Sequence, residues 1–369
     1  MTVVDVVHGS DVVVCCGSGG VGKTTTAAVL GLEAASLGRR VVVVTIDPAR
    51  RLADALGLRD GLSSEPQRVD IADGVVSGDA PSGELWAMML DTAATFDGLV
   101  KRYADDEEQV ERILTNRFYR NMAGAMSGTQ EYMAAETLHA LHFDDRFDLV
   151  IVDTPPSRNA LDFLDAPGVL SRFLDHRVFK LAMLPTRSGL KFIGAAAQPI
   201  FKAIGKVVGS DVLTDALAFF QAFAGMETGF RERADEVIAL LRAERTSFVV
   251  VASPRNDTIT EAVWFARQLL DQGVGVSAAI VNRVHPDVAA GVDLDAVREA
   301  VAANELDPRL LALMSNLLDL DAMRAAELDA LAPLVELTEP APVAVLPLLD
   351  RDVHDIDGLR QIADHLFRT

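Results

Sequence analysis

The amino-acid sequence predicts an α/β fold with a mainly parallel sheet of about seven or eight strands and helices on both faces. Short apolar runs alternate with helical patterns along the chain, which is typical of parallel sheets covered on both sides. A glycine-rich loop joins the first apolar run to a helical stretch. Two longer helical regions, at about 92–142 and 169–245, predict a helical subdomain inserted into a single domain that spans 1–369.

Each short apolar run is expected to form a strand. The runs lie at 12–16, 41–46, 86–90, 149–152, 248–252, 278–281 and 344–346. Residues 59–84 are polar and predict a loop before the third strand. In the second helical region, stretches 190–208 and 212–226 carry apolar residues at helical spacing. These stretches form either a helix–helix core or an exposed groove for a client.

Composition excludes several classes of function. The chain has 369 residues and a net charge of −20, which argues against a nucleic-acid partner because such binding depends on Lys and Arg. It has no run of eighteen uncharged apolar residues, so no transmembrane segment is predicted. The N-terminal stretch, Met1 to His8, is too short and too acidic for a signal peptide, and we therefore predict a cytoplasmic protein.

The two cysteines, Cys15 and Cys16, are neighbours inside the first predicted strand. Neighbouring strand residues point to opposite faces, so the pair is poorly placed to form a disulfide with each other. Two cysteines are also too few for a thiolate zinc site, and no zinc is expected. We interpret both as buried structural residues.

Residues 17–24 read G-S-G-G-V-G-K-T, which matches the phosphate-binding loop G-x-x-x-x-G-K-[ST]. Between a strand and a helix, such a loop turns backbone N–H groups and a helix N-terminus toward an anion. Lys23 can reach the β- and γ-phosphates, and the Thr24 hydroxyl can ligate Mg²⁺. The expected nucleotide-binding residues in this segment are Gly19, Gly20, Val21, Gly22, Lys23, Thr24 and Thr25.

Two aspartates follow predicted strands, at the edge where ligands of parallel sheets bind. Asp47 can activate the water that attacks the γ-phosphate, or it can cap a helix in which Pro48 is the first residue. Asp153 ends the run 149–152, an arrangement known as Walker B, in which the carboxylate positions Mg²⁺ through water.

Four motifs occur in order along the chain: G-G-V-G-K-T-T at 19–25, T-I-D-P-A at 45–49, D-T-P-P-S at 153–157 and I-V-N at 280–282. With these motifs the chain resembles the arsenical-pump-driving and tail-anchored-protein-targeting ATPases, P-loop NTPases of the deviant Walker A class. From W-A-M-M-L-D at 86–91 and L-D-F-L-D-A-P at 161–167, it looks closest to their actinobacterial branch. The resemblance implies an ATPase that uses ATP and Mg²⁺, with Asp47 and Lys23 as catalytic residues. It also implies that Asn282 reads the adenine and that Pro347 lies in a loop packed on it.

The resemblance further implies a homodimer or a heterodimer with a paralogue, acting on a hydrophobic client or a membrane partner. The family usually has a lysine at the second loop position that reaches the partner's nucleotide, whereas this chain has Ser18. Arg50, Arg51 and Arg158 are candidates to replace that charge, or they form local surface pairs. The alternative is therefore a catalytically weak regulatory subunit of a heterodimer. A small-molecule kinase is a third possibility, for which no acceptor-binding signature is visible.

Overall fold

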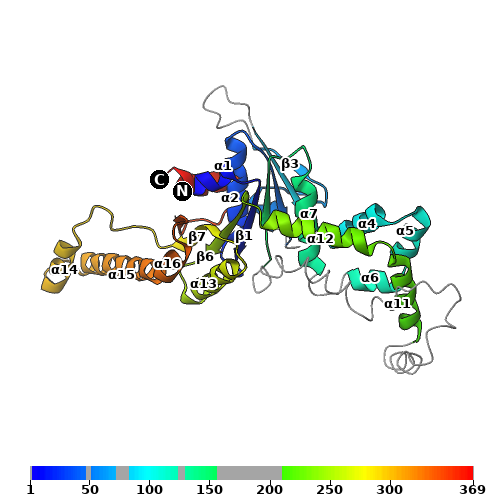
Figure 1. Ribbon diagram of the computed structural model, residues 1–369. Coiled ribbons are helices and arrows are strands. Elements are labelled where there is room, and N and C mark those ends of the chain that lie inside the picture. Colours follow the sequence, from blue (N-terminus) through cyan, green and yellow to red (C-terminus); the bar gives the residue numbers. More distant parts are fainter. Residues whose placement is uncertain (1, 47–50, 72–82, 124–128, 156–209, 369) are drawn as a thin grey trace. The chain divides into compact units, whose positions relative to one another are not determined.

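The chain forms an eight-stranded sheet with the strand order β3-β4-β2-β5-β1-β6-β7-β8. Figure 1 labels several of its strands and the helices packed on them. The computed structural model describes residues 2–46, 51–71, 83–123, 129–155 and 210–368. The strands are β1 (Val12–Gly17), β2 (Arg40–Thr45), β3 (Gln67–Val69), β4 (Glu84–Met89), β5 (Leu149–Asp153), β6 (Thr246–Ala252), β7 (Val276–Val284) and β8 (Val343–Pro347). All neighbouring strands are parallel except β3, which pairs antiparallel with β4. The predicted α/β fold with its mainly parallel sheet is therefore confirmed.

All seven predicted strands are present within a few residues of their expected bounds. The one addition is β3, which lies in the segment expected to be a loop. Only Val69 of its three residues is buried. A strand this short carries no hydrophobic period that the sequence could reveal.

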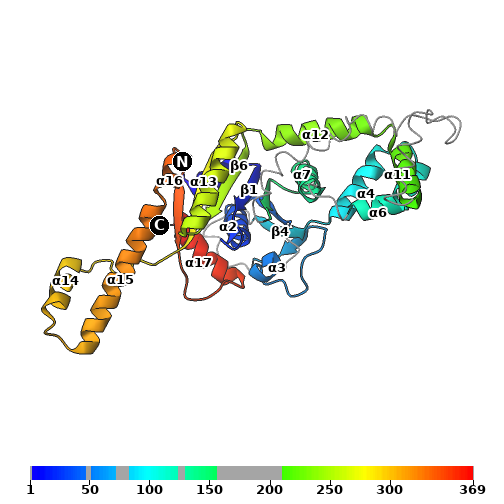
Figure 2. The same ribbon diagram turned by 90° about the horizontal axis from the view of Figure 1, so that it is seen from below.

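Helices cover both faces of the sheet, as the alternation of patterns predicts. The described helices outside residues 90–143 and 162–243 are α1 (Val3–Gly9), α2 (Lys23–Ser36), α3 (Arg51–Ala55), α13 (Asn256–Asp271), α14 (Leu294–Ala303), α15 (Pro308–Ala330), α16 (Ala332–Thr338) and α17 (Ile356–Phe367). Of these, α14 packs mainly on α15 and not on the sheet. Figure 2 shows α2 beside α17 on one face and α13 beside α16 on the other. The core between α2 and the sheet is made of small and branched apolar side chains, which allows the helix to lie close to the strands.

The central strand β1 is buried along its whole length, because helices cover it on both sides. Cys15 belongs to the core cluster under α2, and Cys16 is the next residue along the strand, so its side chain points to the opposite face. Burial raises the pKa of both thiols above the ordinary value. Both cysteines are free, and their environment favours the neutral thiol over the reactive thiolate.

The chain divides into two compact units. Unit 1 comprises Met1–Met89, Asp144–Leu161 and Glu244–Thr369, and unit 2 comprises Leu90–Phe143 and Asp162–Ala243. The described helices of unit 2 are α4 (Thr92–Tyr103), α5 (Glu107–Leu114), α6 (Arg117–Ala123), α7 (Thr129–His142), α11 (Ser210–Phe223) and α12 (Glu227–Leu241). Both helical regions expected from the sequence thus contribute helices to unit 2.

Aromatic side chains form the interior of unit 2. Phe219 and Phe223 of α11 are buried, and their rings lie near those of Tyr119 and Phe230 respectively. The described part of the stretch 212–226 therefore contributes to a helix–helix core, which was one of the two expectations for it. The stretch 190–208 lies outside the described residues.

Helix α15 differs from the other helices of unit 1 because none of its residues is buried. It is attached to the end of β7 through His285, whose backbone N–H and Nδ1 lie 2.8 and 2.7 Å from the Glu327 carboxylate. Arg324 donates to the His285 carbonyl at 2.6 Å. Across the described ranges, no helix combines the length and apolar character needed to cross a membrane.

Candidate active site

The loop between β1 and α2 follows a path that two of its glycines make possible. A Cβ atom on Gly17 would lie 2.0 Å from the Val251 carbonyl oxygen on β6. Gly22 has φ +101°, and a Cβ atom there would lie 2.2 Å from Nδ2 of Asn282. A side chain at either position would collide with a neighbouring strand, so the packing of the loop requires glycine.

Helix α2 begins at Lys23, with Gly22 as its N-cap residue and no side chain capping it. Its first turn also contains no acidic residue. The first N–H groups of a helix have no partner within the helix, and the dipole adds positive potential at that end. The start of α2 can therefore take an anion, as the motif predicts.

Lys23 is buried, and its Nζ atom donates to the Ser18 carbonyl oxygen at 2.8 Å. The ammonium therefore lies against the loop that is expected to surround the phosphates. Gly19 and Gly20 are exposed, and Val21 is buried below them. The predicted phosphate-binding residues thus form one continuous structure from the end of β1 to the first turn of α2.

Thr24 and Asp153 meet at the C-terminal edge of the sheet. Thr24 Oγ1 donates to Asp153 Oδ2 at 2.7 Å, and Thr45 Oγ1 at the end of β2 donates to the same oxygen at 2.9 Å. Asp153 is only 1% exposed. A hydroxyl and a carboxylate are oxygen ligands of the kind that Mg²⁺ prefers.

The arrangement therefore fits Mg²⁺. Within the described ranges, no three or more His, Cys, Asp or Glu side chains gather into a group that could hold a metal. A magnesium site in a nucleotide-binding protein does not need such a group, since Mg²⁺ keeps several waters and takes phosphate oxygens as ligands. Thr24 and Asp153 are the residues that would hold it.

Asn282 and Pro347 lie at the neighbouring strand ends. Asn282 Nδ2 donates to the Val21 carbonyl oxygen at 3.0 Å, so the fold brings this residue to the phosphate loop. Pro347 is the register partner of Val284, two residues beyond Asn282. Asn282 thus lies against the loop, and Pro347 lies at the end of the neighbouring strand β8.

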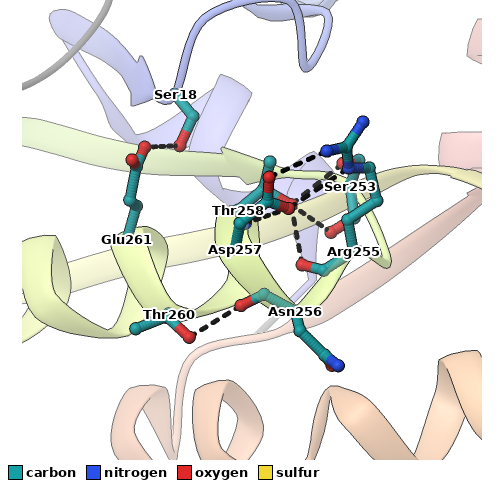
Figure 3. Close-up of polar contacts among 8 residues, drawn as sticks. All are labelled: Ser18, Ser253, Arg255, Asn256, Asp257, Thr258, Thr260 and Glu261. Carbon is teal, nitrogen blue, oxygen red and sulfur yellow. Dashed lines mark hydrogen bonds and ion pairs between the residues drawn. The ribbon is translucent and has the colours of Figure 1, made fainter.

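Sequence reasoning missed two residues that contact the loop. Arg283 donates to the Gly20 carbonyl oxygen at 3.0 Å, and Glu261 of α13 accepts a hydrogen bond from the Ser18 hydroxyl (Figure 3). Neither belongs to a motif that the sequence displays. The only available signal is that Arg283 directly follows Asn282.

Figure 3 also shows how the start of α13, and with it Glu261, is held. Thr258 Oγ1 donates to the Ser253 carbonyl oxygen at 2.7 Å, and Arg255 pairs with Asp257 at 2.8 Å. Ser18 itself is 6% exposed. The second loop position is therefore occupied by a short neutral side chain that is bonded to its own chain.

The structure describes only two of the five remaining candidate site residues. Asp47, Arg50 and Arg158 lie outside the described residues. Arg51 is exposed at the start of α3. Thr25 follows Thr24 in the first turn of α2 and is partly buried. The structure thus unites the loop, Thr24, Asp153, Asn282 and Pro347 within unit 1.

The chain is similar to known ATPases over most of its length. The model of the anion-transporting ATPase family matches residues 10–307. The putative arsenical pump-driving ATPase 1 of Aquifex aeolicus is 24% identical over 379 residues, which cover 96% of this chain and 78% of that protein. The ATPase GET3 of Malassezia globosa is 26% identical over 271 residues, covering 73% and 71% respectively.

A third relative is the ATPase ASNA1 homolog 1 of Paramecium tetraurelia, which is 24% identical over 359 residues covering 95% of this chain and 91% of that protein. The family match includes the phosphate loop, the strand that ends at Asp153 and Asn282 near the end of β7. The chain belongs to the anion-transporting ATPase family, a family of P-loop ATPases.

Proposed function

We propose that this chain binds ATP with Mg²⁺ at the phosphate loop, hydrolyses it, and uses the change of nucleotide as a switch. The observation that carries the proposal is the meeting of Thr24 and Asp153, 2.7 Å apart, beside the uncapped start of α2. A phosphate cradle and a pair of magnesium ligands at one strand edge are the parts that phosphoryl transfer requires.

In this proposal each residue has one task. The N–H groups of the loop and the Lys23 ammonium bind the β- and γ-phosphates, and Thr24 with Asp153 holds the metal. Bound Mg²⁺ offsets the negative charge of the phosphate oxygens. Asp47 accepts a proton from the attacking water, which makes the oxygen a better nucleophile. Asn282 contacts the adenine, and Pro347 packs beside it.

The switch acts on a second chain and on the helices of unit 2. A homodimer, or a heterodimer with a paralogue, closes around nucleotide, and the described helices α11 and α12 change their protection when the nucleotide changes. The output is capture of a hydrophobic client or work on a membrane partner. The relative named as an arsenical pump-driving ATPase supports work on a membrane partner, and the resemblance to the tail-anchored-protein-targeting ATPases supports capture of a client.

The test is ATP binding and phosphate release by the purified chain. Lys23→Ala should abolish turnover or weaken ATP binding, whereas Lys101→Ala, an exposed lysine of α4, is the control and should leave both unchanged. Asp47→Asn should still bind nucleotide but should not hydrolyse it, with Asp54→Asn on α3 as its control. Equal binding and turnover in wild type and Lys23→Ala would contradict the proposal.

A second candidate function is a nucleotide-binding regulatory subunit with slow hydrolysis. It is favoured by one observation, the hydrogen bond that commits Ser18 to Glu261 where the family usually has a lysine. Phosphate release measured with the chain alone and with a lysine-bearing paralogue distinguishes the two. Slow release alone and fast release in the mixture would favour the regulatory subunit.

A further inference from the structure

Two consecutive side chains at the end of β7 bind two consecutive carbonyl groups of the phosphate loop. Asn282 Nδ2 lies 3.0 Å from the Val21 carbonyl oxygen, and a guanidinium nitrogen of Arg283 lies 3.0 Å from the Gly20 carbonyl oxygen. Gly20 and Arg283 are both exposed, so burial does not hold the loop at Gly20, although the next residue, Val21, is buried. The loop at Gly20 is also a glycine segment, which has an unusually large backbone freedom.

A hydrogen bond to a peptide carbonyl also fixes the N–H of the same peptide. The peptide group is planar and trans, so the C=O of Gly20 and the N–H of Val21 point in opposite directions. The same holds for the C=O of Val21 and the N–H of Gly22. Holding both carbonyls toward β7 therefore turns both N–H groups away from it, in the manner of an anion-binding nest.

We propose that Arg283 is a positioning residue for nucleotide binding: through Gly20 it holds the phosphate loop in the shape that receives phosphate. The inference deepens the proposed ATP binding and rests on it. Asn282 acts on the next peptide, so the two side chains together order two consecutive peptide groups, from Gly20 to Gly22.

The backbone at Arg283 is specialised for this contact. Its φ is +67°, in the left-handed region that an arginine rarely adopts. The pairing register of β7 with β8 shifts between Val281 and Val284, so Arg283 lies in a bulge of the strand. Bulges redirect side chains and are frequent beside active sites.

The two residues that follow Arg283 are held by other elements. The Leu348 N–H donates to the Val284 carbonyl oxygen at 2.8 Å, and His285 is bound to Glu327 of α15. An unfavourable backbone conformation persists only where its surroundings determine it, and here both following residues are fixed. The strained residue is therefore a built feature of the strand end that contacts the loop.

A residue that holds the loop acts on any nucleotide that the loop binds. ATP and ADP both place a β-phosphate there, so losing the Arg283 contact should weaken both by the same factor. Turnover at saturating ATP should change little, because the contact is equal in the ground state and the transition state. A residue that touched the γ-phosphate would instead favour ATP over ADP.

The experiment compares Arg283→Asn with Arg283→Lys. Asparagine tolerates positive φ, so it removes the guanidinium without adding strain, whereas lysine keeps a charge and a donor. The matched control is Arg298→Asn on α14, an exposed arginine paired with Asp295, which makes the same change of charge elsewhere. Two measurements are made: hydrogen exchange of the amides at 17–22 without nucleotide, and affinity for ATP and for ADP.

For Arg283→Asn we expect faster exchange of the loop amides and a roughly five- to tenfold loss of affinity for both nucleotides. Arg283→Lys should lie between this variant and wild type, and Arg298→Asn should match wild type. Unchanged exchange in Arg283→Asn, an equal loss in Arg298→Asn, or a loss for ATP alone would each overturn the inference. If the wild type binds no nucleotide, the proposed function fails, while the exchange measurement still tests whether Arg283 holds the loop.

Discussion

Ser18 donates its hydroxyl hydrogen to Glu261, a residue 243 positions away on α13. The bond places a carboxylate next to the loop position where the family usually carries a lysine. This position therefore provides no cation for the phosphates of a partner chain. A lysine introduced at position 18 would therefore first meet the Glu261 carboxylate of its own chain.

Ser18→Lys should raise the rate of phosphate release, because a cation at this position stabilises the charge that develops on the phosphate oxygens. The double variant Ser18→Lys with Glu261→Gln should be faster still, since the new ammonium is then not held by the nearby carboxylate. Glu261→Gln alone is the control. Fast release by the wild type that none of these changes affects would refute the view that the loop lacks a cation.

Thr24→Val should lower the apparent affinity for Mg²⁺ in the ATPase reaction by roughly 10- to 100-fold, because it removes an oxygen ligand without changing shape. Thr26→Val, at a buried threonine two residues along the same helix, is the matched control. Titration of phosphate release with Mg²⁺ at fixed ATP gives the comparison. If both variants require the same Mg²⁺ as wild type, Thr24 is not a metal ligand.

Asn282→Ala should reduce the preference for ATP over GTP. The amide can donate and accept hydrogen bonds, and its Oδ1 atom can accept one from the amino group of adenine. Because Nδ2 also bonds to Val21, the variant should bind both nucleotides less tightly, so the informative quantity is the ratio of the two affinities. Asn256→Ala, at the exposed start of α13, should leave this ratio unchanged, and an unaltered ratio in Asn282→Ala would contradict the assignment.

His139 should make the stability of unit 2 depend on pH. Its burial, together with the Arg233 guanidinium 3.3 Å from its Nε2 atom, lowers the pKa of His139 to about 4. The folded-state pKa lies below the unfolded value near 6.5, so the folded protein prefers the neutral ring. The stabilisation is fully present above about pH 6.5 and is lost as the pH falls toward about 4.

Denaturant unfolding of wild type and His139→Gln at a series of pH values measures this effect. Between about pH 6.5 and 4.5 the wild type should lose on the order of 2 kcal/mol more than the variant. His365→Gln on α17 controls for the loss of a histidine elsewhere. Parallel curves for wild type and His139→Gln would show that this ring does not titrate with unfolding.

Arg233, which contacts His139, also forms a buried ion pair with Glu136. Breaking this pair should change the unfolding free energy more than the titration of His139 does. Arg233 and Glu136 lie 2.6 Å apart, and both side chains are less than a tenth exposed. Arg233→Met should cost roughly 3–5 kcal/mol of unfolding free energy, since it leaves Glu136 charged and buried. Arg146→Met, which breaks the exposed pair with Asp144, should cost at most about 1 kcal/mol. Equal losses in the two variants would argue against a buried charge at Glu136.

The sequence by itself determined the features that are encoded in contiguous residues. The seven runs of apolar residues became strands because the layers packed on the sheet bury their side chains wholly or in part, and the loop at 17–24 took its shape from its own glycines. Because parallel strands finish at one edge, the sequence also determined that Asp153 lies at the ligand-binding edge of the sheet. Its contact with Thr45 additionally requires β2 and β5 to be neighbours.

Tertiary structure alone decided the contacts between segments that are distant in sequence. The bond from Ser18 to Glu261 requires β1 and β6 to be neighbours, and no local pattern specifies that order. The contact of Arg283 with Gly20 depends on a bulge and a positive φ. Neither can be predicted from the sequence at this position, because the residue is an arginine and not a glycine. Strand β3 is too short to show a period and forms only because β4 offers it an edge. Local pattern therefore determined the parts of the active site, and strand order with backbone geometry decided which side chains complete it.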